Sequence, residues 1–76
     1  MTPLSELRPG QRATVVSVTG DGALIQRLAE LGLLEGDEIE FVTTAPLGDP
    51  IEVRVGDTRL SLRKADAALI FVAVIA

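Results

Sequence analysis

The chain has 76 residues, with 11 acidic and 7 basic side chains, and it contains no histidine and no cysteine. Without these two residue types there is no disulfide, no zinc site built on thiolates or imidazoles, and no Ser-His-Asp or Cys-His catalytic site. The net charge of -4 and the scarcity of aromatic rings, two phenylalanines in all, argue against a protein that binds nucleic acid.

The first expected strand covers residues 11–18, which are rich in valine. A glycine-containing loop follows at residues 19–22. Residues 23–31 then predict a short helix, in which the apolar face is formed by leucines at spacings of four and three, namely Leu24, Leu28 and Leu31. Asp21 is placed to cap the start of this helix, and Gly32 is placed to end it in a left-handed conformation.

The next expected strand, residues 38–43, alternates between acidic and apolar positions. Glu38 and Glu40 are expected to face solvent, while Ile39 and Phe41 face the core. The segment that follows, residues 45–50, holds two prolines and a glycine, and it therefore predicts a loop rather than a helix or a central strand.

The clearest local pattern is a β-hairpin formed by residues 51–55 and 59–63. Both segments alternate between apolar and polar residues, and Gly56-Asp57 is a two-residue turn sequence. Residues 64–67 predict a single turn of tight helix. The apolar stretch that follows predicts a last strand at residues 69–75.

Five short strands and one inserted helix favour an all-β fold, a small barrel with the helix in its first long loop. A small α+β sandwich, with the helix laid across a sheet, is the competing architecture. A chain of this length buries only about 60% of its unfolded surface, so we expect one domain over residues 1–76. It is too small for an enclosed catalytic pocket, and we expect no enzyme activity and no cofactor.

No targeting segment is evident in the sequence. The first six residues lack the basic and apolar regions of a signal peptide. The longest apolar run, residues 67–76, is about half the ~20 residues that a membrane helix requires, so we expect no membrane insertion. These features favour a cytoplasmic protein.

Several collinear stretches resemble the FeoA family, the small accessory proteins of bacterial ferrous iron transport. The most specific is Ala45–Pro50 (APLGDP), preceded by Arg27–Gly36 (RLAELGLLEG) and followed by Leu60–Lys64 (LSLRK). The start, Leu4–Gly10, and the segment Ala67–Ile70 resemble the family too. One departure is Glu35, a position at which many relatives carry proline before the glycine.

The resemblance implies a five-stranded SH3-like barrel with a helix in its first long loop, which selects the barrel over the sandwich. It also implies a partner, the large FeoB-like ferrous iron permease, whose cytoplasmic part carries a GTP-binding domain. The chain is then expected at the inner membrane only through this partner. The implied function is a non-enzymatic accessory protein that binds and regulates the permease.

Four leucines crowd the end of the expected helix, more than a single apolar face uses. Most must be core residues, but we expect one or two of Leu31, Leu33 and Leu34 to stay exposed. An exposed apolar side chain on a small domain is typical of a protein contact. We therefore place the candidate partner-binding surface here, with burial in the core as the alternative.

The loop at residues 46–50 has two interpretations. In the first it is a rigid partner-facing loop, with Leu47 as the contact residue. In the second, which we favour, Pro46, Gly48, Asp49 and Pro50 form a structural turn, and Asp49 caps it by accepting hydrogen bonds from nearby backbone amides.

Basic residues concentrate on the outer face of the hairpin and just after it. Arg54 and Arg59 are expected to pair with neighbours such as Glu52. Arg63 and Lys64 are candidates for steering an acidic partner, and a GTPase partner also raises the alternative of an arginine finger.

The acidic residues between positions 21 and 40 lack the spacing of a calcium loop, and we interpret them as solubilising charge rather than a metal site. The last strand is apolar on both faces, so the N-terminal segment, a second copy of the chain or the partner must cover it.

Two other functional classes stay open. A regulatory module of a metal-dependent transcription regulator would need a separate DNA-binding partner, because this chain has neither a basic face nor a recognition helix. A GTPase-activating partner would need a catalytic arginine. An SH3 domain that binds proline motifs is disfavoured, because such grooves are built from aromatic rings.

Overall fold

The computed structural model describes residues 1–76 and consists of a six-stranded antiparallel sheet with three short helical segments. In chain order the elements are β1 (Thr2–Pro3), the 3₁₀ helix η1 (Leu4–Glu6), β2 (Arg12–Val18), α1 (Gly22–Glu30), β3 (Glu38–Thr44), β4 (Ile51–Val55), β5 (Thr58–Leu62), α2 (Lys64–Ala67) and β6 (Ile70–Val74). All five expected strands are present, and β1 is an addition that the sequence analysis did not include.

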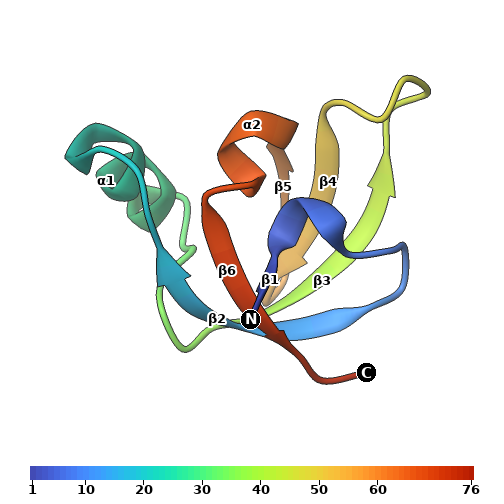
Figure 1. Cartoon of the computed structure of the whole chain (residues 1–76), viewed down its shortest axis with the longest axis horizontal. Coiled ribbons are helices and arrows are strands. Elements are labelled where there is room, and N and C mark those ends of the chain that lie inside the picture. The colour runs from blue at the N-terminus through green and yellow to red at the C-terminus, as the bar shows by residue number, and fades with distance from the viewer.

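The sheet has the order β1-β6-β2-β3-β4-β5 and curls around the core, as Figure 1 shows. Two strand pairs shift register, β2 with β6 after Val15 and β3 with β4 after Phe41. Such bulges bend a strand and increase its twist, which lets a short sheet curl. The two edge strands, β1 and β5, do not pair with each other. The helical segments that follow them in the chain, η1 after β1 and α2 after β5, pack against each other. The expected small all-β barrel is confirmed, and the sandwich alternative is wrong.

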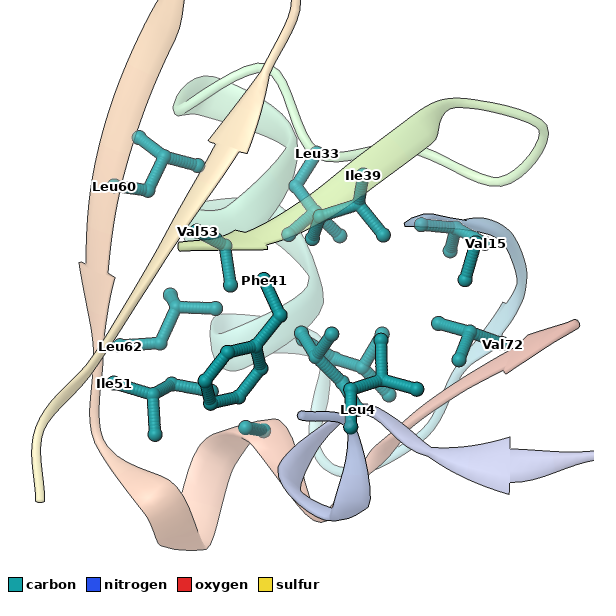
Figure 2. Packing of buried hydrophobic residues seen from close by; sticks show 14 of the residues in the cluster. Leu4, Val15, Leu33, Ile39, Phe41, Ile51, Val53, Leu60, Leu62 and Val72 are labelled. Carbon is teal, nitrogen blue, oxygen red and sulfur yellow. The ribbon is translucent and has the colours of Figure 1, made fainter. Parts of the chain in front are cut away.

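The core consists of 16 buried residues, all of them apolar. Phe41 is the largest of them and lies among side chains from distant parts of the chain, including Leu4, Ile51 and Leu62 (Figure 2). The expected alternation in β3 is confirmed, because Ile39 and Phe41 are buried while the acidic residues beside them face outward. Branched aliphatic side chains therefore fill most of the barrel, and Phe41 is the one aromatic residue among those that are buried.

Helix α1 begins and ends as expected. The Oδ1 atom of Asp21 accepts a hydrogen bond from the backbone N–H of Leu24 at 2.8 Å. At the other end Gly32 has φ +93°, a left-handed conformation that favours glycine. The helix buries Leu24 and Leu28, but Leu31 at its C-terminal cap is 44% exposed. The expected apolar face is therefore narrower than the spacing of three leucines indicates.

The turn after α1 has the geometry of a Schellman motif. The N–H of Leu33 donates to the carbonyl of Leu28 at 2.9 Å, and the N–H of Gly32 donates to that of Ala29 at 2.9 Å. This pattern brings the residue after the glycine back against the last turn of the helix, so Leu33 is buried beside Leu28. Leu33 is therefore a core residue, and its inclusion among the candidate contact residues is wrong.

The hairpin and the segment after it have the expected arrangement. Strands β4 and β5 pair around the two-residue turn Gly56-Asp57, with Val55 opposite Thr58. The following segment, α2, differs in type from the expected tight turn. The N–H groups of Ala67 and Ala68 bond to carbonyls four residues back, which is α-helical.

The edge of the last strand is paired in part with the chain's own N-terminal segment. Strand β1 pairs with β6, and Pro3 lies opposite the half-buried Phe71. The other face of β6 contributes Ile70 and Val72 to the core. The N-terminal segment therefore protects only the first part of this strand, and Val74 at its end and Ile75 just after it stay 45% and 50% exposed. None of the helices is long and apolar enough to cross a membrane.

Candidate partner-binding surface

Two leucines near the end of α1 are exposed. Leu31 is 44% exposed and Leu34 is 52% exposed. Leu34 lies in a turn that holds its backbone firmly, because its N–H donates to Oδ2 of Asp37 at 2.9 Å and its carbonyl accepts from the Asp37 N–H at 3.1 Å. The turn fixes the backbone of Leu34 without burying its side chain, and an exposed apolar side chain on a small domain is typical of a protein contact.

A groove of about 500 Å³ lies between α1, the end of β5 and α2; we call it the α1–β5 groove. Its apolar lining comes from Leu28, Leu31 and Leu62, and its polar lining comes from Arg27, Ser61, Arg63 and Asp66. Leu28 and Leu62 belong to the core, while Leu31 remains partly exposed. The groove therefore has a partly exposed apolar side chain, Leu31, on one side and the end of strand β5 on the other.

Of the two arginines that line this groove, only Arg27 has an ion-pair partner. Arg27 forms an ion pair with Asp66 at 2.9 Å, which links α1 to α2. Arg63 has no carboxylate partner within ion-pair distance. Four of the seven cationic side chains are paired, through the contacts Arg12–Glu38, Arg27–Asp66, Arg54–Glu40 and Arg59–Glu52. The expected pairing of Arg59 with Glu52 is confirmed, and Arg63 and Lys64 are adjacent and unpaired.

The loop between β3 and β4 holds the most exposed leucine of the chain, Leu47, at 96%. Backbone bonds close its base, from the Ala45 N–H to the Pro50 carbonyl at 2.9 Å and from the Gly48 N–H to the Ala45 carbonyl at 2.8 Å. Gly48 has φ +85°, so a left-handed residue is required there. The structural-turn interpretation of this loop thus accounts for its glycine and for its closed base.

Asp49 has a different role from the expected one. Its Oδ1 atom accepts a hydrogen bond from the N–H of Lys64 at 3.0 Å, 15 residues along the chain, rather than from the amides of its own loop. Lys64 is the first residue of α2, and no side chain of the preceding residue caps that helix. Asp49 therefore satisfies a free N–H at the start of α2 and ties the β3–β4 loop to it.

The structure brings some of the candidate residues together and separates others. Leu31 and Arg63 both line the α1–β5 groove, whereas Leu34, Leu47 and Lys64 do not. In Figure 1 the β3–β4 loop and α1 lie on opposite sides of the view, with α2 between them. Leu47 therefore belongs to a separate surface.

The sequence analysis missed Ser61 and the Arg27–Asp66 pair as groove residues. Their meeting depends on α1 lying beside the end of β5, and no local pattern in the sequence indicates this. The acidic residues between positions 21 and 40 form no cluster of three or more side chains that could hold a metal ion.

The curled antiparallel sheet, the helix inserted between β2 and β3 and the open groove beside it define the class of small SH3-like barrel domains. More specifically, a family model described as the FeoA domain matches residues 2–74. The chain belongs to the FeoA family.

A curated relative is the Fe(2+) transport protein A/Fe(2+) transporter FeoB fusion protein of Porphyromonas gingivalis, which is 44% identical over 72 residues. The match covers 95% of this chain but 8% of that protein, so the chain spans a small fraction of the length of this relative.

Two solved structures are similar over nearly the whole chain. The solution structure of a FeoA protein from Chlorobium tepidum has a TM-score of 0.93 at 43% identity, covering 99% of this chain and 71% of that one. The crystal structure of Stenotrophomonas maltophilia FeoA, described as a procaryotic SH3 domain protein complexed with zinc, has a TM-score of 0.78 at 41% identity, covering 95% and 88%. These neighbours agree with the SH3-like barrel that the resemblance implied.

Proposed function

We propose that this protein is a non-enzymatic accessory protein of bacterial ferrous iron uptake, which binds the FeoB-like permease and regulates it. It acts in the cytoplasm and is held at the inner membrane by this partner.

The observation that carries the proposal is the Porphyromonas gingivalis fusion, in which a segment 44% identical to this chain is joined to a FeoB transporter. Joining two binding partners in one chain raises their effective concentration to the millimolar range, without any new contact. A domain that works on the transporter gains from such a fusion, whereas a domain with an unrelated task does not. The fusion therefore supports a physical interaction between the two parts.

The surface of the chain suits such an interaction. Leu31 offers exposed apolar area beside the unpaired Arg63, on elements fixed by the Schellman turn and by the Arg27–Asp66 ion pair. Fixed apolar and cationic groups of this kind favour a protein partner over nucleic acid, because the chain as a whole carries a charge of -4.

Regulation requires that the chain bind one state of the permease better than another. A ligand shifts a conformational equilibrium only by the difference between its affinities for the two states. A tenfold difference in affinity, about 1.4 kcal/mol, changes the ratio of the two states by the same factor. The GTP-binding domain expected in the partner offers such states, since its nucleotide changes during turnover.

The experiment is equilibrium binding of the labelled chain to full-length permease in detergent, in the nucleotide-free, GDP-bound and GTP-analogue-bound states. A label is needed because the chain lacks tryptophan, tyrosine and cysteine. We expect binding in every state, with affinities that differ by about tenfold between GDP and the GTP analogue. Absence of binding in every state, with a permease that hydrolyses GTP, would falsify the proposal.

A GTPase-activating role is the second candidate, and the unpaired Arg63 is the observation that favours it. An arginine supplied in trans to a GTPase raises turnover by about 10³–10⁵. Measuring GTP turnover of the permease with the wild-type chain and with Arg63→Lys distinguishes this role from simple binding. Activation that disappears in the lysine variant would select the second candidate.

A further inference from the structure

Strand β5 is one edge of the sheet, since its only partner is β4. The other edge, β1, is two residues long and contains Pro3, which has no N–H to offer a further strand. The five-residue β5 therefore provides the longer edge at which another chain can pair.

The register of the hairpin identifies which backbone groups of β5 are free. Val55 and Thr58 flank the two-residue turn, and a tight turn closes through a hydrogen bond between its first and fourth residues. Bonded and non-bonded pairs alternate along an antiparallel ladder, so Leu60 and Leu62 bond to β4. The N–H and C=O groups of Arg59 and Ser61 then point away from β4, and no turn or loop bond satisfies them.

The free edge faces a helix across the α1–β5 groove. Ser61 lines the groove on the strand side, while Leu28 and Leu31 line it on the helix side. A groove between an edge strand and a helix is the geometry in which PDZ and PTB domains receive an extended peptide. The peptide's backbone pairs with the edge strand, and alternate side chains enter the apolar space beside it.

The charges in the groove indicate which charge a bound peptide should carry. Arg27 and Asp66 neutralise each other, which leaves Arg63 as the unpaired charge at the end of β5. Asp49 shares a neighbouring hollow with Arg63, but its Oδ1 atom is bonded to the Lys64 amide. A carboxylate on the occupant is therefore favoured at this end, next to an apolar residue that covers Leu31.

We infer that the α1–β5 groove binds an extended acidic segment of the partner permease by β-strand addition to β5. The inference rests on the proposed function, because it takes the permease as the partner, and it adds the mode of recognition. From Arg59 in β5 to Arg63, the extended residue just after the strand, the chain is about 13 Å long at ~3.3 Å per residue, so the bound segment is about five residues. An apolar side chain of this segment covers Leu31, and a neighbouring carboxylate pairs with Arg63.

The test compares two substitutions at one position. Ser61→Pro removes the outward N–H without breaking a bond to β4, and proline is tolerated on edge strands. Ser61→Ala keeps that N–H and is its matched control. Binding to full-length permease in detergent is expected to weaken about tenfold or more for Ser61→Pro and less than about twofold for Ser61→Ala.

Charge reversals provide a second variant that does not depend on the tolerance of proline. Arg63→Glu is expected to weaken binding about tenfold or more, whereas Arg8→Glu, at an exposed and equally unpaired arginine after η1, is expected to change it by less than about twofold. Amide hydrogen exchange of the wild-type chain is measured with and without the permease. The Arg59 and Ser61 amides are expected to exchange fast in the free chain, and bound permease is expected to slow them.

The outcomes separate the inference from the proposed function. Binding that is equal for wild type, Ser61→Pro and Arg63→Glu overturns strand addition and leaves the permease as partner. Absence of binding by the wild type overturns both. Self-association of the wild-type chain in sedimentation, lost in Ser61→Pro, would assign the edge to a second copy and overturn the permease segment as its occupant.

Discussion

The hydrogen bond from the Lys64 N–H to Asp49 gives a quantitative test of the tertiary structure around the groove. It joins the β3–β4 loop to the start of α2, and α2 in turn carries Asp66, the partner of Arg27. Replacing Asp49 with alanine leaves the N–H of Lys64 at the helix start without a protein acceptor. We therefore expect Asp49→Ala to destabilise the whole barrel rather than the loop alone.

The expected loss of unfolding free energy in Asp49→Ala follows from the exposure of the two bonded residues and from the charge of the Asp49 carboxylate. Loss of a capping side chain costs about 0.5–2 kcal/mol, and a bond to a charged group lies toward the upper end in buried sites. Both residues here are exposed, which lowers the value to about 1 kcal/mol. For a domain of this size that corresponds to a fall in Tm of about 4–8 °C. Asp49→Asn keeps an acceptor oxygen and is expected to lose about half as much.

The assay is thermal and urea unfolding followed by far-UV circular dichroism, because the chain has no tryptophan or tyrosine to report on folding. Asp57→Ala is the matched control, since this exposed aspartate in the β4–β5 turn makes no side-chain hydrogen bond or ion pair. If Asp49→Ala and Asp57→Ala lower the free energy of unfolding equally, Asp49 does not stabilise α2 and the reasoning is refuted.

Two further stability predictions concern the end of α1. Leu28→Ala removes a buried side chain and should lower the free energy of unfolding by about 2–5 kcal/mol. Leu34→Ala, at a half-exposed position, should change it by less than about 0.5 kcal/mol. Similar losses for the two variants in urea unfolding would mean that the assigned burial is wrong. Gly32→Ala should cost about 1 kcal/mol because Gly32 has φ +93° with open space around it, so the loss comes from the backbone. Gly22→Ala, at the helix start with ordinary φ and open space, should instead stabilise by about 0.4–1 kcal/mol, and a loss in both variants would contradict the conformational argument.

Local sequence patterns were sufficient for most of the fold. Alternating residues identified the strands and the β4–β5 hairpin, because a strand that buries one face has a period of two. The ends of α1 followed from Asp21 and Gly32, whose side-chain and backbone properties act within four residues of themselves. Strand β1 was missed because two residues are too few to show a pattern, and its pairing with β6 joins opposite ends of the chain.

The candidate site was predicted in part. A crowd of leucines at the end of α1 correctly indicated an excess of apolar surface, but spacing alone does not reveal which side chain turns inward. The burial of Leu33 follows from the Schellman turn, and its signal is the leucine immediately after Gly32. The pairing of Asp49 with Lys64 and the groove beside Ser61 depend on contacts between distant segments, so no local rule could identify them.

The central claim, that the chain binds the permease through the surface beside α1, is tested most directly by a titration of full-length permease with leucine variants. Leu31→Glu places a charge in the α1–β5 groove, and Leu47→Glu places the same charge on the separate β3–β4 loop, at a side chain that is even more exposed. With both variants folded by circular dichroism, we predict that Leu31→Glu weakens binding about tenfold or more and that Leu47→Glu changes it by less than about twofold. Unchanged affinity for a folded Leu31→Glu, or a loss confined to Leu47→Glu, would contradict the account.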